Sequence, residues 1–257
     1  MIHAKYQRSH EGVGHGASGR HAGAHRPDAA GMTLVDLIDQ ADLSLEDRAQ
    51  VMQALQGVPM EASEAFPAEV NARLPVANEH ARANIERVPG GFKAKAQQLL
   101  DVAYRSGTAS QRVMWIRRAA DALAEGYGPV SACRAGCAHC CHIPVKISLA
   151  EAQVLGKAIG RKPVAPAQHG PAPADQEPCG FLQDGQCSIY SERPAVCRGH
   201  MNMDVDELLC RPVTGASVPV PYLDVTPLVM ARVATGGHTA YADIRQWFPS
   251  KLAEVSR

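Results

Sequence analysis

Four of the eight cysteines in this 257-residue chain lie within nine residues, and this cluster constrains the fold more than any other feature. They are Cys133, Cys137, Cys140 and Cys141, and His142 follows directly. The other four are Cys179, Cys187, Cys197 and Cys210, whereas the first 132 residues and the last 47 contain none. A hydrophobic core does not need so many thiols in so short a segment, so we interpret residues 133–210 as a site built from cysteine side chains.

The spacing of the first four cysteines limits how they can share a metal. In a helix their sulfurs would face one way, since offsets of four, seven and eight residues fall within about 100°. They would also spread over roughly 12 Å of helix axis, whereas zinc–sulfur bonds are about 2.3 Å long. Two arrangements remain: the segment bends at Gly136 into a knuckle, or the thiols serve more than one metal together with the downstream cysteines. The vicinal pair Cys140 and Cys141 favours the second, because neighbouring side chains diverge.

Other uses of the cysteines fit less well. A disulfide framework is compatible with an even number of cysteines, but no signal-peptide-like stretch supports it. Inert burial would explain one or two of them, Cys210 most readily. We therefore predict eight metal ligands: Cys133, Cys137, Cys140, Cys141, Cys179, Cys187, Cys197 and Cys210. All-thiolate sites suit zinc and iron–sulfur clusters equally, so the pattern does not distinguish these metals.

Charged and aromatic neighbours of the cysteines are further candidates for roles at the site. His139 and His142 are candidate ligands, although histidines that flank thiolates more often lie outside the coordination shell. Arg134, Arg193 and Arg198 would offset the negative charge of coordinated sulfur.

A β-hairpin is predicted around Asp184 and Gly185, within residues 181–190. In a two-residue turn Cys187 would lie opposite Leu182, and Cys179 and Cys187 would then face opposite sides, since strand side chains alternate. If both bind one site, the loop must contain a bulge, or Cys179 must precede the strand.

The predicted fold class is mainly α (α+β), an N-terminal helical region joined to a small cysteine-rich metal domain with a short hairpin. We expect a helix that begins at Ser44, a short strand in residues 143–147, and a helix that a Ser148–Glu151 capping box starts. The predicted helices after residue 75 are 76–87, 92–105, 109–125, 149–159, 226–234 and 239–248. The predicted parts are 1–31, a disordered His/Gly/Ala-rich segment; 32–128, helical; 129–211, the cysteine-cluster metal-binding domain; and 212–257, a C-terminal helical tail that packs back on the helical region.

In the N-terminal segment, His10, His15, His21 and His25 could collect a metal loosely. We instead expect this segment to be disordered, or the natural protein to start at Met32.

Composition excludes several classes of function. The chain has 26 basic and 26 acidic side chains, so no broad cationic field favours nucleic acid. It has no run of 18 apolar residues, so no membrane span is expected. We expect a cytoplasmic protein whose partners are a metal ion or cluster and, through the helical region, another protein.

The two cysteine blocks resemble a bacterial cysteine-cluster family described as zinc- or iron-chelating. Its mark, Cys-x3-Cys-x2-Cys-Cys, is matched by the four cysteines of the first block. A second family block is similar to Cys179, Leu182, Gly185, Cys187, Ile189, Tyr190, Arg193, Pro194, Cys197 and Arg198. The resemblance covers roughly residues 130–200 and implies that seven cysteines are ligands, with Cys210 placed where some relatives have one more.

The favoured function is a metal-binding protein that holds zinc or an iron or iron–sulfur centre. The alternative is an iron–sulfur or thiol-dependent oxidoreductase or transferase, since one branch of the family includes an enzyme that N-methylates flagellin lysines. No Gly-rich strand–turn–helix for a nucleotide-like cofactor is present, so that activity is not transferred. A structural zinc module is a third interpretation. The sequence assigns no catalytic residue.

Overall fold

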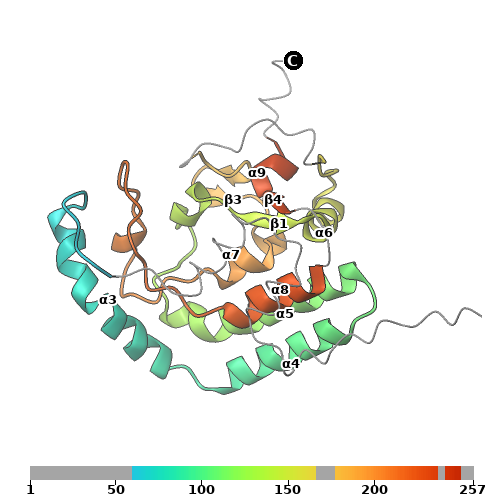
Figure 1. Cartoon of the computed structure of the whole chain (residues 1–257), viewed down its shortest axis with the longest axis horizontal. Coiled ribbons are helices and arrows are strands. Elements are labelled where there is room, and N and C mark those ends of the chain that lie inside the picture. The colour runs from blue at the N-terminus through green and yellow to red at the C-terminus, as the bar shows by residue number, and fades with distance from the viewer. Residues whose placement is uncertain (1–59, 166–176, 237–240, 250–257) are drawn as a thin grey trace, which may run out of the picture. The chain divides into compact units, whose positions relative to one another are not determined.

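The computed structural model describes residues 60–165, 177–236 and 241–249, all within the unit Thr33–Arg257 (Figure 1). The predicted disordered segment 1–31 and the helix expected to begin at Ser44 lie outside these residues. The described part is mainly helical with a few short antiparallel strands, which confirms the predicted fold class. No helix in these ranges is both long and apolar enough to cross a membrane.

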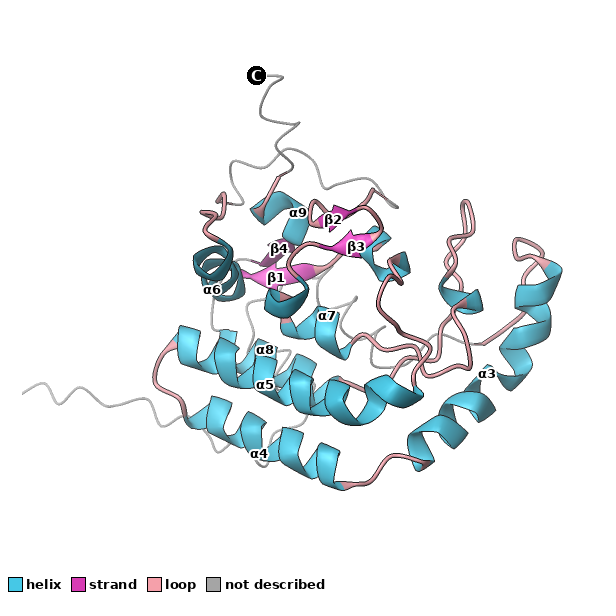
Figure 2. Cartoon of the chain, turned by 180° about the vertical axis from the view of Figure 1, so that it is seen from behind, coloured by secondary structure: helices cyan, strands magenta, loops and turns pink. Residues whose placement is uncertain are grey.

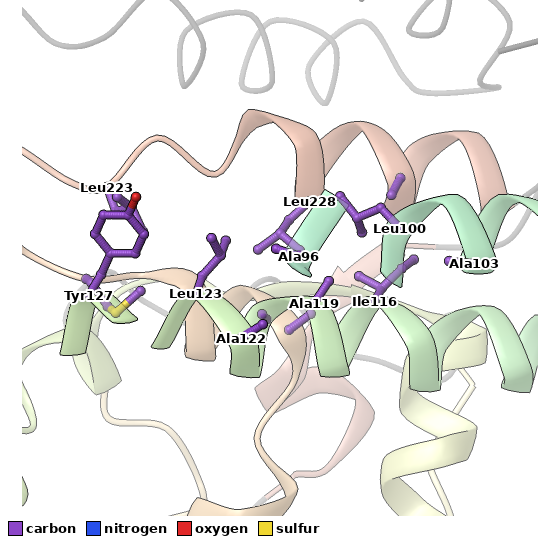
Figure 3. Close-up of a cluster of buried hydrophobic side chains, with 14 of the residues drawn as sticks. Ala96, Leu100, Ala103, Ile116, Ala119, Ala122, Leu123, Tyr127, Leu223 and Leu228 are labelled. Carbon is purple, nitrogen blue, oxygen red and sulfur yellow. The ribbon is translucent and has the colours of Figure 1, made fainter. Parts of the chain in front are cut away.

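Three helices build the largest hydrophobic core, and they are α4 (Gly91–Arg105), α5 (Ala109–Tyr127) and α8 (Thr226–Gly236). α5 begins with a capping box between Thr108 and Gln111, which satisfies backbone N–H groups of its first turn. Leu100, Ile116 and Leu228 meet at the centre of this core (Figure 3). Alanines fill much of the remaining interface, which allows the helix backbones to approach closely.

Gly126 shows how close this approach is. A Cβ atom at this position would lie 2.5 Å from Cγ of Phe92 on α4. We expect Gly126→Ala to lower the free energy of unfolding by about 1–3 kcal/mol, since the added methyl group forces Phe92 out of its site. Gly128→Ala is the matched control, because a Cβ there meets nothing within 4 Å. Chemical denaturation of both variants measures the effect, and equal midpoints would show that the α4–α5 contact tolerates the methyl group.

Helix α3 (Ala68–Glu86) is joined to the segment 202–206 through a buried carboxylate. Asp204 has an exposed fraction of 0% and accepts a hydrogen bond from Arg73 at 3.0 Å. Its other oxygen lies 2.8 Å from Nδ1 of His80. The helix begins eight residues before the predicted 76–87 and passes through Pro75, so the prediction from the prolines was too short.

A second, smaller core lies around the strand pair β1 (Lys146–Ser148) and β4 (Tyr241–Asp243). Trp247 is fully buried there, and its indole N–H donates to the Ile147 carbonyl at 3.0 Å. Helix α6 (Leu149–Ile159) begins with the predicted capping box and ends at Gly160, whose φ is +68°. The Ser148–Glu151 prediction is therefore confirmed.

The predicted helix 239–248 is wrong over its described first part. Residues 241–243 form β4, and only Ile244–Trp247 form a helix, α9. Pairing with β1 supplies hydrogen-bond partners to the backbone of β4, and Asp243 then caps α9 by accepting from the Arg245 N–H at 2.8 Å. The strand predicted at 143–147 is likewise displaced, to 146–148.

The predicted hairpin is confirmed. β2 (Leu182–Gln183) pairs with β3 (Gln186–Cys187), with Leu182 opposite Cys187. Asp184 and Gly185 form the two-residue turn with φ of +49° and +72°, the left-handed region that type I′ turns require at both positions.

Candidate metal centre

The first four cysteines lie on an irregular loop between α5 and β1. Gly136 has a φ of +85°, which favours glycine, and it bends the loop between Cys133 and Cys137. The Cys137 N–H donates to the Arg134 carbonyl at 3.0 Å across this bend. Residues His139–His142 then form a 3-10 turn. The segment is therefore the knuckle that the spacing allowed, rather than a helix.

The hairpin and the helix α7 (Ala195–Gly199) bring the later cysteines to this knuckle. The Cys179 N–H donates to the Cys141 carbonyl at 2.7 Å, which joins the two cysteine segments directly. Cys179 precedes β2, so it escapes the strand alternation that would separate it from Cys187. Cys197 lies on α7, which is placed between α5 and the hairpin (Figure 2).

A cavity of about 250 Å3 lies between the knuckle and the hairpin. Six cysteines from the two segments line it: Cys137, Cys140, Cys141, Cys179, Cys187 and Cys197. Phe181, Tyr190 and Arg193 form part of the remaining wall, and the Arg193 guanidinium stacks 3.6 Å from the centre of the Tyr190 ring. The fold therefore brings together thiols that are far apart in the sequence.

Cys133 and Cys210 lie outside this cavity and share a different neighbour, Asn202. The Asn202 backbone N–H donates to Cys133 Sγ at 3.4 Å, and its side-chain amide donates to Cys210 Sγ at 3.3 Å. The Asn202 side chain also donates to the Asp206 carbonyl at 3.0 Å, which fixes its orientation. All eight cysteines are described and all are free thiols.

Burial and neighbouring sulfur atoms shift the pKa of several of these thiols. Burial raises the pKa of Cys197 to about 12 and that of Cys210 to about 12. A hydrogen bond from Cys141 lowers the pKa of Cys140, and Arg193 lowers it further, whereas the pKa of Cys141 is raised by the same bond. Without a bound cation, Cys141, Cys197 and Cys210 are therefore neutral at pH 7, and Cys140 is the thiol most readily ionised.

Arg134 and Arg193 line the cavity beside the thiols, whereas Arg198 is not among its lining residues. Arg193 lines the cavity and stabilises the Cys140 thiolate. Arg198 forms an ion pair with Asp121 of α5, and Arg134 forms one with Glu207.

The candidate histidines lie beside the cavity rather than on it. His139 and His142 belong to the 3-10 turn, but neither is among the residues that line the cavity. Sequence reasoning missed His200, whose Nε2 is buried without a hydrogen-bond partner and whose ring lies 3.9 Å from that of Tyr222. Burial lowers the pKa of His200 to about 4, so the imidazole is neutral. Its position three residues after Cys197 was the signal available in the sequence.

The chemistry of the donors fits a metal, but their present positions do not form a closed coordination site. Among the residues that the structure describes, no three His, Cys, Asp or Glu side chains are grouped so that they could hold an ion. Thiolates are suited to zinc and iron, so the donor set is appropriate. The sulfur atoms would have to move inward on binding, as in sites whose binding free energy is also folding free energy.

Residues 132–214 match a family model, CxxCxxCC, described as "Putative zinc- or iron-chelating domain". The match includes both cysteine blocks and confirms the resemblance for this segment. Neither the curated proteins nor the solved structures provide a match to the chain. The segment that forms the cavity is therefore similar to the domain that this model describes.

Proposed function

We propose that the protein binds zinc or iron through the thiolates of its eight cysteines. The observation that carries this proposal is the single cavity that six cysteines from two distant segments line. A core of ordinary composition would place apolar side chains there. A reducing compartment such as the cytosol suits the proposal, because thiols stay free there.

A second candidate is an iron–sulfur or thiol-dependent oxidoreductase or transferase. The volume of the cavity supports this second candidate. At about 250 Å3 it is larger than one ion requires, and it equals the volume of roughly eight liquid waters. Tyr190 and Arg193 would then offer a stacking surface and a positive charge beside the thiols. Catalysis at the metal itself requires an open coordination position, which a centre closed by four thiolates lacks.

The two candidates are distinguished by anaerobic purification, elemental analysis and a visible spectrum. Stoichiometric zinc in a colourless protein supports the metal-binding function alone. Iron with acid-labile sulfide and an oxygen-sensitive colour supports the second candidate. A folded protein that takes up neither zinc nor iron would contradict both.

We also propose that another protein binds to the helical region. Met114 on α5 and Val76 on α3 expose 46% and 39% of their surfaces, and these are apolar side chains that such a partner would cover.

We expect Asn202→Ala to weaken zinc binding about 10- to 100-fold, the usual effect of losing a group that orients metal ligands. The substitution removes the hydrogen bond to Cys210 Sγ but keeps the backbone donor to Cys133. Competition with a chelator measures the affinity. Asn84→Ala is the matched control, since Asn84 donates hydrogen bonds to the Met203 carbonyl at 2.9 Å and to the Asp204 carbonyl at 3.5 Å rather than to a cysteine. Equal affinities for the two variants would show that Asn202 orients no ligand.

A further inference from the structure

We infer that helix α3 positions a metal ligand, with Arg73 acting through Asp206 on the thiol of Cys210. α3 contains no cysteine, and none of its residues lines the cavity. It holds the segment 202–210, which ends at Cys210, in the arrangement that metal binding requires. This inference rests on the proposed function, since it takes Cys210 to be a ligand.

The Arg73 guanidinium binds the Asp206 carboxylate with two parallel hydrogen bonds. Nη1 of Arg73 donates to Oδ1 and Nη2 donates to Oδ2, both at 3.0 Å. A bidentate pair of this kind fixes the orientation of both groups as well as their separation. The hydrogen bonds from Arg73 also lower the pKa of Asp206, so its carboxylate is ionised at neutral pH. α3 therefore holds residue 206 at a defined place.

Asp206 is connected to Cys210 along two short routes. Its Oδ1 atom accepts from the Leu208 N–H at 3.0 Å, at the start of the 3-10 turn Leu208–Cys210. Its backbone carbonyl accepts from the side-chain amide of Asn202 at 3.0 Å, and the same amide nitrogen donates to Cys210 Sγ at 3.3 Å. A shift of Asp206 would therefore displace the cysteine and its hydrogen-bond donor together.

A second carboxylate, that of Asp204, holds the other side of the Asn202 side chain. The Asp204 N–H donates to Asn202 Oδ1 at 2.9 Å, and both residues are buried. Arg73 and His80 of α3 lie 3.0 and 2.8 Å from the two oxygens of the Asp204 carboxylate. The amide that donates to Cys210 is thus bonded at its oxygen and at its nitrogen to residues that α3 holds.

Apolar packing joins α3 to the same turn independently of these charges. Leu209, which directly precedes Cys210, is buried in a core that it shares with Leu74 and Ala77 of α3. Ala81, one turn further along α3, lies instead in the core that α4, α5 and α8 build. The first half of α3 therefore packs on the turn that carries the cysteine, and its second half joins it to the rest of the protein.

Because both kinds of contact end at Cys210, metal binding and the docking of α3 stabilise each other. An ion that fixes the Cys210 sulfur also fixes the turn on which α3 packs, and a docked α3 holds the sulfur in place before the ion arrives. Linkage requires the two effects to be equal in size. Couplings of this kind are typically about 5- to 150-fold, and we expect about tenfold here.

Hydrogen exchange of the full wild-type chain tests this coupling without any substitution. The chain is compared when loaded with the ion that it takes up, Zn²⁺ or Fe²⁺, and after chelation. Amides of residues 70–77 in α3 are expected to exchange about tenfold faster without metal, whereas those of α4 stay unchanged. Equal exchange of residues 70–77 in the two states would overturn the inference. A chain that takes up neither ion would instead contradict the proposed function.

Asp206→Ala tests the route from α3 to Cys210. The substitution removes the bidentate pair with Arg73 and the hydrogen bond that starts the 3-10 turn. It leaves no charge buried without a partner, because 44% of the Asp206 side chain is exposed and Arg73 keeps its ion pair with Asp204.

Asp206→Ala is expected to weaken metal binding about tenfold in competition with a chelator. It should also abolish the effect of metal on the exchange of residues 70–77, while the hairpin keeps its response. Glu125→Ala is the matched control, since it removes one carboxylate that pairs with Lys95 on α4. Equal metal affinities of the two variants would show that α3 positions no ligand.

Discussion

Removing the metal with a chelator is expected to open the knuckle and the hairpin while α4 and α5 stay folded. The cysteine segment contains little regular structure of its own, since β2 and β3 have two residues each and α7 has five. α4 and α5 share a large core that does not include the cysteines. We therefore expect metal binding to supply much of the stability of the knuckle and the hairpin, as it does in zinc fingers, where it contributes about 10–16 kcal/mol.

Hydrogen exchange with and without chelator measures this effect residue by residue. Amides of the knuckle and hairpin are expected to exchange roughly 1,000-fold faster without metal, because zinc at 1,000 times its Kd stabilises the bound form by about 4 kcal/mol. Residues after Cys197 should respond less, since Met201 and Met203 pack into the helical core. α5 is the internal control. Unchanged exchange in the hairpin would show that the cysteine segment folds without a cation.

Zinc affinity is expected to fall steeply as the pH is lowered. In the metal-free protein the pKa of Cys197 and that of Cys210 are raised to about 12, so both thiols carry protons at neutral pH. A metal that binds them displaces these protons. The free protein thus holds more protons than the loaded protein, and a lower pH favours the free form. Each proton that an ion displaces corresponds to about a tenfold loss of affinity for that ion for each pH unit.

Competition titrations at several pH values, and calorimetry in buffers of different ionisation enthalpy, measure the number of protons released. Cys210→Ser is expected to release one proton fewer than the wild-type protein when it binds zinc. An affinity that does not change with pH would mean that these thiols do not bind the metal as thiolates.

Local features of the fold were predictable because their signals lie within a few residues. Ser148 and Glu151 start α6, and Asp184 with Gly185 fixes the register of the hairpin. β4 was not predictable, because its three residues become a strand only by pairing with β1, nearly 100 residues earlier. The docking of α3 depends on Asp204, a buried carboxylate whose partners lie more than 120 residues away.

The candidate site was likewise predictable where its signals lie close together in the sequence. The number and spacing of the cysteines indicate the site, and Gly136 indicates the bend between Cys133 and Cys137. The contribution of Asn202 was hidden, because a single asparagine carries no pattern until the fold places it between Cys133 and Cys210. The same holds for His200, whose ring packs against Tyr222, a residue that no local pattern links to it.

X-ray absorption at the metal edge of the anaerobically purified protein tests most directly whether thiols from both segments surround a cation. A coordination shell of four sulfur atoms at about 2.3 Å is expected for zinc. In Cys187→Ser protein, the average number of sulfur ligands around the metal should fall. A shell made mainly of oxygen or nitrogen in the wild-type protein would contradict the account.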